Sequence, residues 1–242
     1  MEESNNKILN MNRKIIIIPA FDEEDNLFPV ISGIKKHSDS DIVVINDGSE
    51  DRTRENAREA GVRVISHPFN MGYGVALQTG YKYAVKKGYD FLVQMDGDGQ
   101  HDPKYIQELF RMVESGESDI VIGSRFLQES DYDAGVLKKT GINIFRFMIR
   151  LISGRKITDP TSGYQCLSRK VFEILTGDLF PSDYPDADMI IMLHRMGFTI
   201  KEVPVTMIPN REGRSMHQGF FTVLYYFFKM FLSFFIALRR EK

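Results

Sequence analysis

The segment Asp96-Gly97-Asp98-Gly99-Gln100 places two carboxylates and an amide oxygen together, directly after the apolar run 91–95. Oxygen ligands of this kind suit a hard divalent cation, so Asp96, Asp98 and Gln100 are candidate ligands for Mg²⁺ or Mn²⁺. An ion held by one or two carboxylates keeps positions open for water and substrate phosphates, and it can stabilise a departing diphosphate as a Lewis acid. An isolated Asp-x-Asp is more often an ordinary turn, so this interpretation depends on the neighbouring loops.

Three other polar loops have residue types that suit a nucleotide. Segment 19–26 combines a rigid proline, an aromatic residue and several acceptors ahead of a helix, although its acidic residues also suit simple helix capping. In Asn46-Asp47-Gly48-Ser49, Asp47 can accept a hydrogen bond from a base, but alone the segment is typical of a turn. The glycines of Asn70-Met71-Gly72-Tyr73-Gly74 allow close backbone approach to an anion at a helix N-terminus.

Alternating strands and helices must position these loops. Apolar runs predict buried strands, the first of which contains four consecutive isoleucines after Lys14. Helical patterns separate the runs, which predicts βαβ units and a mostly parallel sheet flanked by helices. Ligands of such sheets bind beyond the carboxyl ends of the strands, so the four loops should meet at one edge. The predicted strands are 14–19, 41–46, 62–66, 91–95 and 120–122, and the predicted helices are 24–38, 51–60, 73–87, 103–115, 136–152 and 186–196.

Taken together and in this order, these loops resemble the motifs of inverting family 2 glycosyltransferases, with most similarity to the dolichyl-phosphate mannose synthase-like branch. The match runs from about residue 14 to residue 215 and includes Gly123-Ser124-Arg125. The resemblance implies a Rossmann-like α/β domain of the GT-A type and a nucleoside diphosphate sugar donor, UDP- or GDP-hexose, of which we favour uridine. It also implies metal ligation by Asp96, Asp98 and Gln100, and donor binding by Pro19, Ala20, Phe21, Glu23, Asp47, Gly48, Ser49, Gly72, Gly74, Asp96 and Gly97.

Two further segments take their roles from the resemblance. Asp159-Pro160-Thr161-Ser162-Gly163, followed by Tyr164, is similar to a turn that shapes the sugar and acceptor pocket, with Ser162 as an acceptor contact. Arg211 and Ser215 lie in a segment similar to an arginine-containing loop that closes over the donor diphosphate, and guanidinium groups suit phosphate oxygens. The alternative for this second segment is a solvated basic loop.

The acceptor decides which side chains the reaction needs. A lipid phosphate is already anionic and requires cations to position it, for which Arg125 and Lys139 are the candidates. A hydroxyl acceptor requires a general base, for which Asp188 is the candidate. The predicted catalytic residues are therefore Asp98, Arg125 and, for a hydroxyl, Asp188. We favour a polyprenyl phosphate, with a hydroxyl acceptor in polysaccharide synthesis as the first alternative and an inactive nucleotide-sugar-binding partner protein as the second.

Composition and the C-terminal segment suggest where the protein works. The 31 basic and 33 acidic residues nearly balance, which gives no support for nucleic acid as a partner. The only cysteine, Cys166, and a polar start to the chain favour the cytoplasm. Segment 219–238 contains nine aromatic residues and one charge, Lys229, and basic residues follow it. We expect a flexible N-terminus over 1–13, a catalytic domain over 14–218, and over 219–242 a helix that lies on the inner face of the cell membrane or joins a homo-oligomer.

Overall fold

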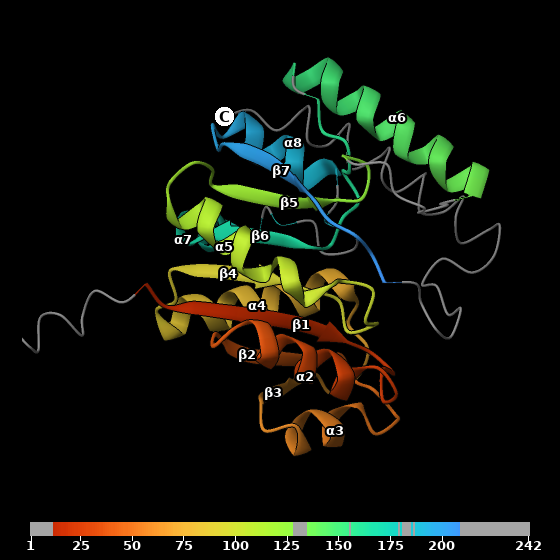
Figure 1. Ribbon diagram of the computed structural model, residues 1–242, viewed down its shortest axis with the longest axis vertical. Helices are drawn as coiled ribbons and strands as arrows, with labels where there is room; N and C mark the ends of the chain where they lie inside the picture. The colour runs from red at the N-terminus through yellow and green to blue at the C-terminus, as the bar shows by residue number, and fades with distance from the viewer. Residues whose placement is uncertain are drawn as a thin grey trace, which may run out of the picture.

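The computed structural model describes residues 12–127, 135–154, 156–178, 180, 185 and 187–208. Within them the chain forms a seven-stranded sheet in the order β3-β2-β1-β4-β6-β5-β7. Figure 1 shows these strands following one another along the long axis, from β3 and α3 at one end to α8 and α6 at the other. The strands are β1 (Lys14–Ala20), β2 (Asp41–Asn46), β3 (Arg63–Ser66), β4 (Phe91–Gln94), β5 (Ile120–Ser124), β6 (Gln165–Ser168) and β7 (Ile200–Pro204).

The four isoleucines of β1 explain why this strand lies in the middle of the sheet. Ile15 to Ile18 are all fully buried, and their side chains alternate between the two faces. Ile15 and Ile17 join the core on the side of α4 (Tyr73–Lys87). Ile16 and Ile18 join the core beneath α2 (Leu27–His37) and α5 (Ile106–Glu114). An apolar run without alternation therefore forms a strand that is covered on both faces.

The parallel half of the sheet matches the predicted βαβ pattern. β1 pairs in parallel with β2 and with β4, and β2 pairs in parallel with β3. The bounds of α4 are those predicted, and the bounds of α2 and α3 (Thr53–Glu59) differ from the predicted ones by one to three residues. Gly80 lets α4 approach β1 closely, because a Cβ there would lie 2.8 Å from the Cδ1 atom of Ile17. The prediction of a mostly parallel α/β sheet is confirmed.

The second half of the sheet contains two strands that the sequence analysis did not predict. β6 is antiparallel and lies between β4 and β5, while β7 pairs in parallel with β5. The short helix α7 (Arg169–Ile174) follows β6 directly. The remaining helices, α6 (Gly135–Ser153) and α8 (Ala187–Arg195), pack against each other and agree with the predicted 136–152 and 186–196. A 3-10 turn, η1 (Pro103–Tyr105), forms the start of the helix predicted from residue 103.

Parts of the predicted domain organisation lie outside the described residues. These parts are the N-terminal residues 1–11 and the whole C-terminal segment 219–242. Among the helices that the structure does describe, none combines the length and the hydropathy that crossing a bilayer requires.

Candidate active site

The carboxyl ends of β1, β2 and β4 bring three of the predicted loops together. Ala20 at the end of β1 is in register with Asn46 at the end of β2, and the Asp47 amide donates to the Ala20 carbonyl at 2.9 Å. On the other side of β1, the Met95 amide donates to the Ile17 carbonyl at 3.1 Å. These main-chain bonds place the loops 19–26, 46–49 and 96–100 side by side, at the edge of the sheet where the sequence predicts them.

Three carboxylates gather at this edge, those of Glu23, Asp96 and Asp98. Burial raises the pKa of Asp96, and burial together with the neighbouring Asp96 charge raises the pKa of Asp98. Burial also raises the pKa of Glu23 to about 7, and the charges of Asp98 and Asp96 act in the same direction. Gly97 permits this crowding, because a Cβ there would lie 3.3 Å from the Pro19 carbonyl oxygen. The cluster is therefore electrostatically unfavourable when all three groups are ionised.

The donor set fits a divalent cation that shares its ligands with a substrate. In the part of the chain that the structure describes, no three His, Cys, Asp or Glu side chains converge as a complete metal site. Mg²⁺ and Mn²⁺ sites in phosphate-transferring proteins commonly use one or two carboxylates and leave the other positions to phosphates and water. Asp96 and Asp98 would supply two such ligands, and a cation would relieve their mutual repulsion.

Asp96 has well-defined neighbours. The Tyr73 hydroxyl donates to Asp96 Oδ1 at 2.8 Å, and the Asp96 amide donates to His101 Nδ1 at 3.0 Å. His101 Nε2 lies 3.7 Å from Asp96 Oδ2. The His101 ring stacks on Tyr164, with a centroid separation of 4.8 Å and an interplanar angle of 14°. Burial lowers the pKa of His101 to about 4, so the imidazole is neutral at pH 7.

The sequence motifs predict no role for His101 or for the Tyr73 side chain. His101 directly follows the segment 96–100, the predicted metal-binding turn (hereafter the metal turn), and this adjacency is a signal that could have found it. Its main chain also forms an isolated β-bridge with Met207, which connects the turn to the segment after β7. No comparable signal marks Tyr73, because its contact with Asp96 joins residues 23 positions apart.

The first predicted nucleoside loop presents an exposed aromatic ring. Phe21 is 43% exposed, next to the backbone of Asp22, which has a positive φ of 52°. This conformation is uncommon outside glycine, asparagine and aspartate. Two hydrogen bonds hold it: the Asp22 amide donates to Ser49 Oγ at 3.1 Å, and the Glu50 amide donates to Asp22 Oδ1 at 3.1 Å. Ser49 thus connects the first and second predicted loops. The Phe21 ring beside this contact is accessible to a ligand.

Asp47 is buried and binds the glycine-rich loop. Its carboxylate accepts from the amides of Met71 and Gly72 at 2.9 and 2.8 Å and contacts His67 Nδ1 at 2.7 Å. Gly48 is required beside it, because a Cβ there would lie 2.3 Å from the carbonyl carbon of Phe69. Gly72 has a positive φ of 99° and precedes α4, whose first turn contains the buried Gly74. Asp47 therefore positions the N-terminus of α4, whatever else it contacts.

The residues predicted to bind the acceptor occupy a second, largely buried network. Arg125 forms a bidentate ion pair with Asp159, with Nε to Oδ2 at 2.6 Å and Nη2 to Oδ1 at 2.7 Å. Its side chain is 7% exposed and that of Asp159 is fully buried. Ser162 Oγ donates to the Gly123 carbonyl at 2.6 Å, so its hydroxyl fixes the turn 159–163 against β5. Both groups thus have firm partners within the protein.

The remaining predicted site residues are only partly described. Asp188 is buried at the start of α8, where Oδ1 accepts from the Met189 amide at 2.8 Å. Arg211 and Ser215 lie outside the described residues, and so does the side chain of Lys139, whose backbone is in α6.

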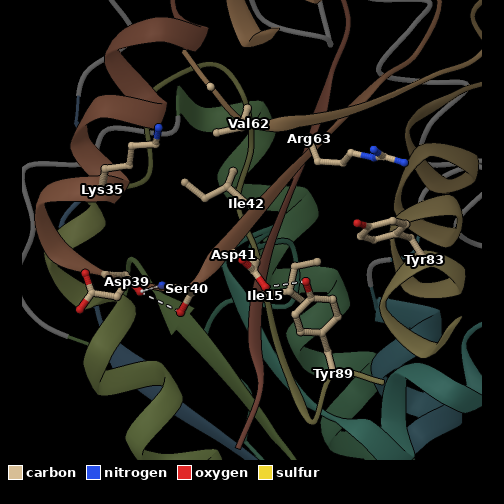
Figure 2. A pocket seen from close by; sticks show the side chains of 12 residues that line it. Ile15, Lys35, Asp39, Ser40, Asp41, Ile42, Val62, Arg63, Tyr83 and Tyr89 are labelled. Carbon is tan, nitrogen blue, oxygen red and sulfur yellow. Dashed lines mark hydrogen bonds between the residues drawn. The ribbon is translucent and has the colours of Figure 1, made fainter. Parts of the chain in front are cut away.

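A cavity of about 390 Å³ lies at the opposite edge of the sheet, where β1, β2 and β3 begin. Figure 2 shows Asp41 and Tyr89 pointing toward each other there, and Lys35 and Arg63 at its sides. The Tyr89 hydroxyl donates to Asp41 Oδ2 at 2.6 Å. Because it lies at the amino ends of the strands, this cavity is separate from the loops at the carboxyl ends, where ligands of parallel sheets bind.

Comparisons with known proteins agree with this geometry. The model of the family described as Glycosyl transferase family 2 matches residues 15–175. Polyprenol monophosphomannose synthase from Mycolicibacterium smegmatis is 32% identical over 86% of this chain and 82% of its own length. UDP-N-acetylglucosamine–dolichyl-phosphate N-acetylglucosaminyltransferase from Methanococcus voltae is 28% identical over 80% of this chain and 84% of its own length.

The fold is also similar to that of a solved enzyme. Glucosyl-3-phosphoglycerate synthase from Mycobacterium tuberculosis, in complex with Mn²⁺, uridine diphosphate and phosphoglyceric acid, superimposes with a TM-score of 0.73. The alignment covers 96% of this chain and 80% of that chain at 20% identity. This likeness confirms the GT-A type of fold.

Proposed function

Because the chain belongs to glycosyl transferase family 2 and is a glycosyltransferase, we propose that it transfers a hexose from a nucleoside diphosphate sugar to a polyprenyl phosphate. The reaction proceeds with inversion, depends on Mg²⁺ or Mn²⁺, and takes place at the cytoplasmic face of a membrane. The donor is a UDP- or GDP-hexose.

The observation that carries the proposal is the carboxylate cluster at the end of β4. Asp96 and Asp98 have raised pKa values, and their turn packs against the end of β1 and is hydrogen-bonded to the first residue of α4. A bound Mg²⁺ or Mn²⁺, held by these carboxylates and Gln100, would supply Lewis-acid stabilisation of the departing diphosphate. The other donor contacts come from the exposed Phe21 ring and from the N-terminus of α4 at Gly74, where a helix N-terminus favours anions. Gly72 leads into this helix end, with its own amide bound to Asp47.

A phosphate acceptor suits the groups present on the other side of the site. An anionic phosphate oxygen can attack the anomeric carbon directly, while the bond from that carbon to the diphosphate breaks on the opposite face of the sugar. No proton has to be removed, so the protein needs to position charge and not to supply a base. Arg125, fixed by Asp159 and close enough to act on the charge of Asp96, contributes positive potential to this region.

The two relatives support the acceptor class more strongly than the sugar. Their names specify a polyprenol or dolichyl phosphate in both cases, but mannose in one and N-acetylglucosamine in the other. We therefore extend the lipid phosphate to this chain and leave the identity of the hexose to experiment.

The test is an incubation of the full chain with radiolabelled UDP-glucose, UDP-N-acetylglucosamine or GDP-mannose and undecaprenyl phosphate. Undecaprenol, which carries a hydroxyl in place of the phosphate, serves as the matched acceptor. We expect a lipid-linked sugar only with the phosphate, and only when Mg²⁺ or Mn²⁺ is present. Asp98→Asn should lower the rate by about 100-fold or more, since a metal contributes several kcal/mol to stabilisation of the transition state. Equal transfer in excess EDTA, or transfer to undecaprenol alone, would contradict the proposal.

A further inference from the structure

We propose that Tyr73 is a positioning residue for the metal turn, because its hydroxyl holds the Asp96 carboxylate in the orientation that binds the cation. The proposal rests on the metal-dependent function above.

The geometry restricts Asp96 from two sides. Tyr73 Oη lies 2.8 Å from Asp96 Oδ1, while His101 Nε2 faces Oδ2 at 3.7 Å. His101 Nδ1 also accepts from the Asp96 amide, so the main chain of the turn is fixed as well. With Oδ1 in a strong hydrogen bond to a phenol, the carboxylate plane cannot rotate freely about the Cβ–Cγ bond.

Gly163 packs against the side chains of both Tyr73 and Asp96. A Cβ at this position would lie 2.9 Å from both Asp96 Oδ2 and Tyr73 Oη, a distance that real Cβ atoms do not tolerate. Three segments far apart in sequence therefore meet around one carboxylate: the start of α4, the end of β4 and the turn 159–163. The glycine admits the close packing, and the Tyr73 hydroxyl supplies a directional bond to Asp96 Oδ1.

The position of Tyr73 in the chain connects the metal turn to the donor loop. Tyr73 is the first residue of α4 and directly follows Gly72, whose amide Asp47 binds. The same short segment thus binds Asp47 through the Gly72 amide and the proposed metal ligand Asp96 through the Tyr73 hydroxyl. Hydrogen-bond partners of metal ligands orient them, and removal of such a partner typically weakens metal binding by about 10- to 100-fold.

The experiment compares Tyr73→Phe with Tyr89→Phe in the full chain. Both changes delete a tyrosine hydroxyl that donates to an aspartate. Tyr89, however, binds Asp41 in the cavity of Figure 2, at the amino ends of the strands and away from the metal turn. Free Mn²⁺ is titrated by electron paramagnetic resonance in saturating UDP and, in a parallel series, in saturating GDP. Binding of each nucleotide without metal is measured by calorimetry.

We expect Tyr73→Phe to weaken Mn²⁺ binding by about tenfold or more and to leave metal-free nucleotide binding unchanged. Tyr89→Phe should leave both quantities at the wild-type level. If Tyr73→Phe binds Mn²⁺ as tightly as the wild type, or if both variants weaken Mn²⁺ binding equally, the positioning role is wrong. If the wild type binds no Mn²⁺ with either nucleotide, the metal-dependent function fails together with the inference.

Discussion

At the scale of single residues, Glu23 controls how the stability of the metal-free protein responds to pH. Its pKa is raised from 4.5 to about 7, first by burial and then by the charges of Asp98 and Asp96. A carboxyl with a higher pKa in the folded chain than in the unfolded chain binds its proton more tightly when folded. Its stabilising contribution is therefore complete below pH 4.5 and is lost as the pH rises through 7.

Glu23→Gln should remove this pH dependence because the amide does not titrate. In EDTA, we expect the melting temperature of the wild type to fall relative to that of Glu23→Gln between pH 5 and pH 8. Differential scanning fluorimetry over this range measures the effect, with Glu50→Gln, a change at an exposed glutamate in the adjacent loop, as the control. If the melting temperatures of the wild type and Glu23→Gln change in parallel with pH, Glu23 is not the group whose titration causes the pH dependence.

Asp188 distinguishes the two acceptor classes. Under the proposed transfer to a phosphate, Asp188→Asn should change the turnover number by less than about tenfold, because no base is required. A general base typically contributes about 10²- to 10⁴-fold, so a loss of that size would instead favour a hydroxyl acceptor. Asparagine keeps the oxygen that accepts from the Met189 amide, and a circular dichroism spectrum checks that the start of α8 is intact.

At the scale of secondary-structure elements, the contact between α4 and β1 sets the position of the donor loop. Gly80→Ala would place a Cβ 2.8 Å from Ile17 Cδ1. Alanine is intrinsically better in a helix by about 1 kcal/mol, but overpacking a core typically costs about 1–3 kcal/mol. We expect a net destabilisation in urea unfolding, and we expect Ile17→Val to cost less in the Gly80→Ala background than in the wild type. Additive effects of the two changes would rule out this clash.

The elements that the sequence predicts well are those whose apolar pattern decides their structure alone. The Ile15–Ile18 run and the α4 pattern belong to this group, and their bounds were predicted within a residue. β6 was missed because it has four residues, two of them polar, and its burial comes from β4 and β5 on either side. β7 was missed because exposed Lys201 and half-buried Glu202 interrupt its apolar positions.

In the site, as in the fold, features set by local sequence were predicted, and features set by contacts between distant segments were missed. The carboxylates and glycines of the strand-end loops were predicted because each loop follows a recognisable strand. The hydrogen bond from Tyr73 to Asp96, and the ion pair between Arg125 and Asp159, depend on tertiary contacts that no local pattern specifies. This ion pair bears directly on the prediction that Arg125 contacts the acceptor. Asp159 already binds two of the guanidinium nitrogens of Arg125, so an acceptor phosphate would compete with Asp159 for them.

At the scale of the whole molecule, the proposed reaction requires the protein to reach a lipid substrate. Segment 219–238 is the candidate for this contact, and Arg239 and Arg240 follow it. Basic residues near an anionic bilayer contribute about 1 kcal/mol each, so a double change to Arg239→Glu and Arg240→Glu should weaken binding by about tenfold or more.

Flotation of the full chain with vesicles of phosphatidylglycerol and phosphatidylcholine measures this binding. Vesicles of phosphatidylcholine alone serve as the control for the electrostatic part. Identical flotation of the wild type and the double variant on anionic vesicles would show that these arginines do not contribute.

The late position of the antiparallel strand β6 in the sequence also has a consequence for folding during synthesis. β4 ends at residue 94, but its partner β6 begins only at residue 165. A nascent chain shorter than this displays β4 as an unprotected sheet edge, and such edges recruit strands from other chains. Ribosomal pausing or truncation between these points should therefore favour aggregation, whereas completion of the next few residues covers the edge and brings Gly163 against Asp96.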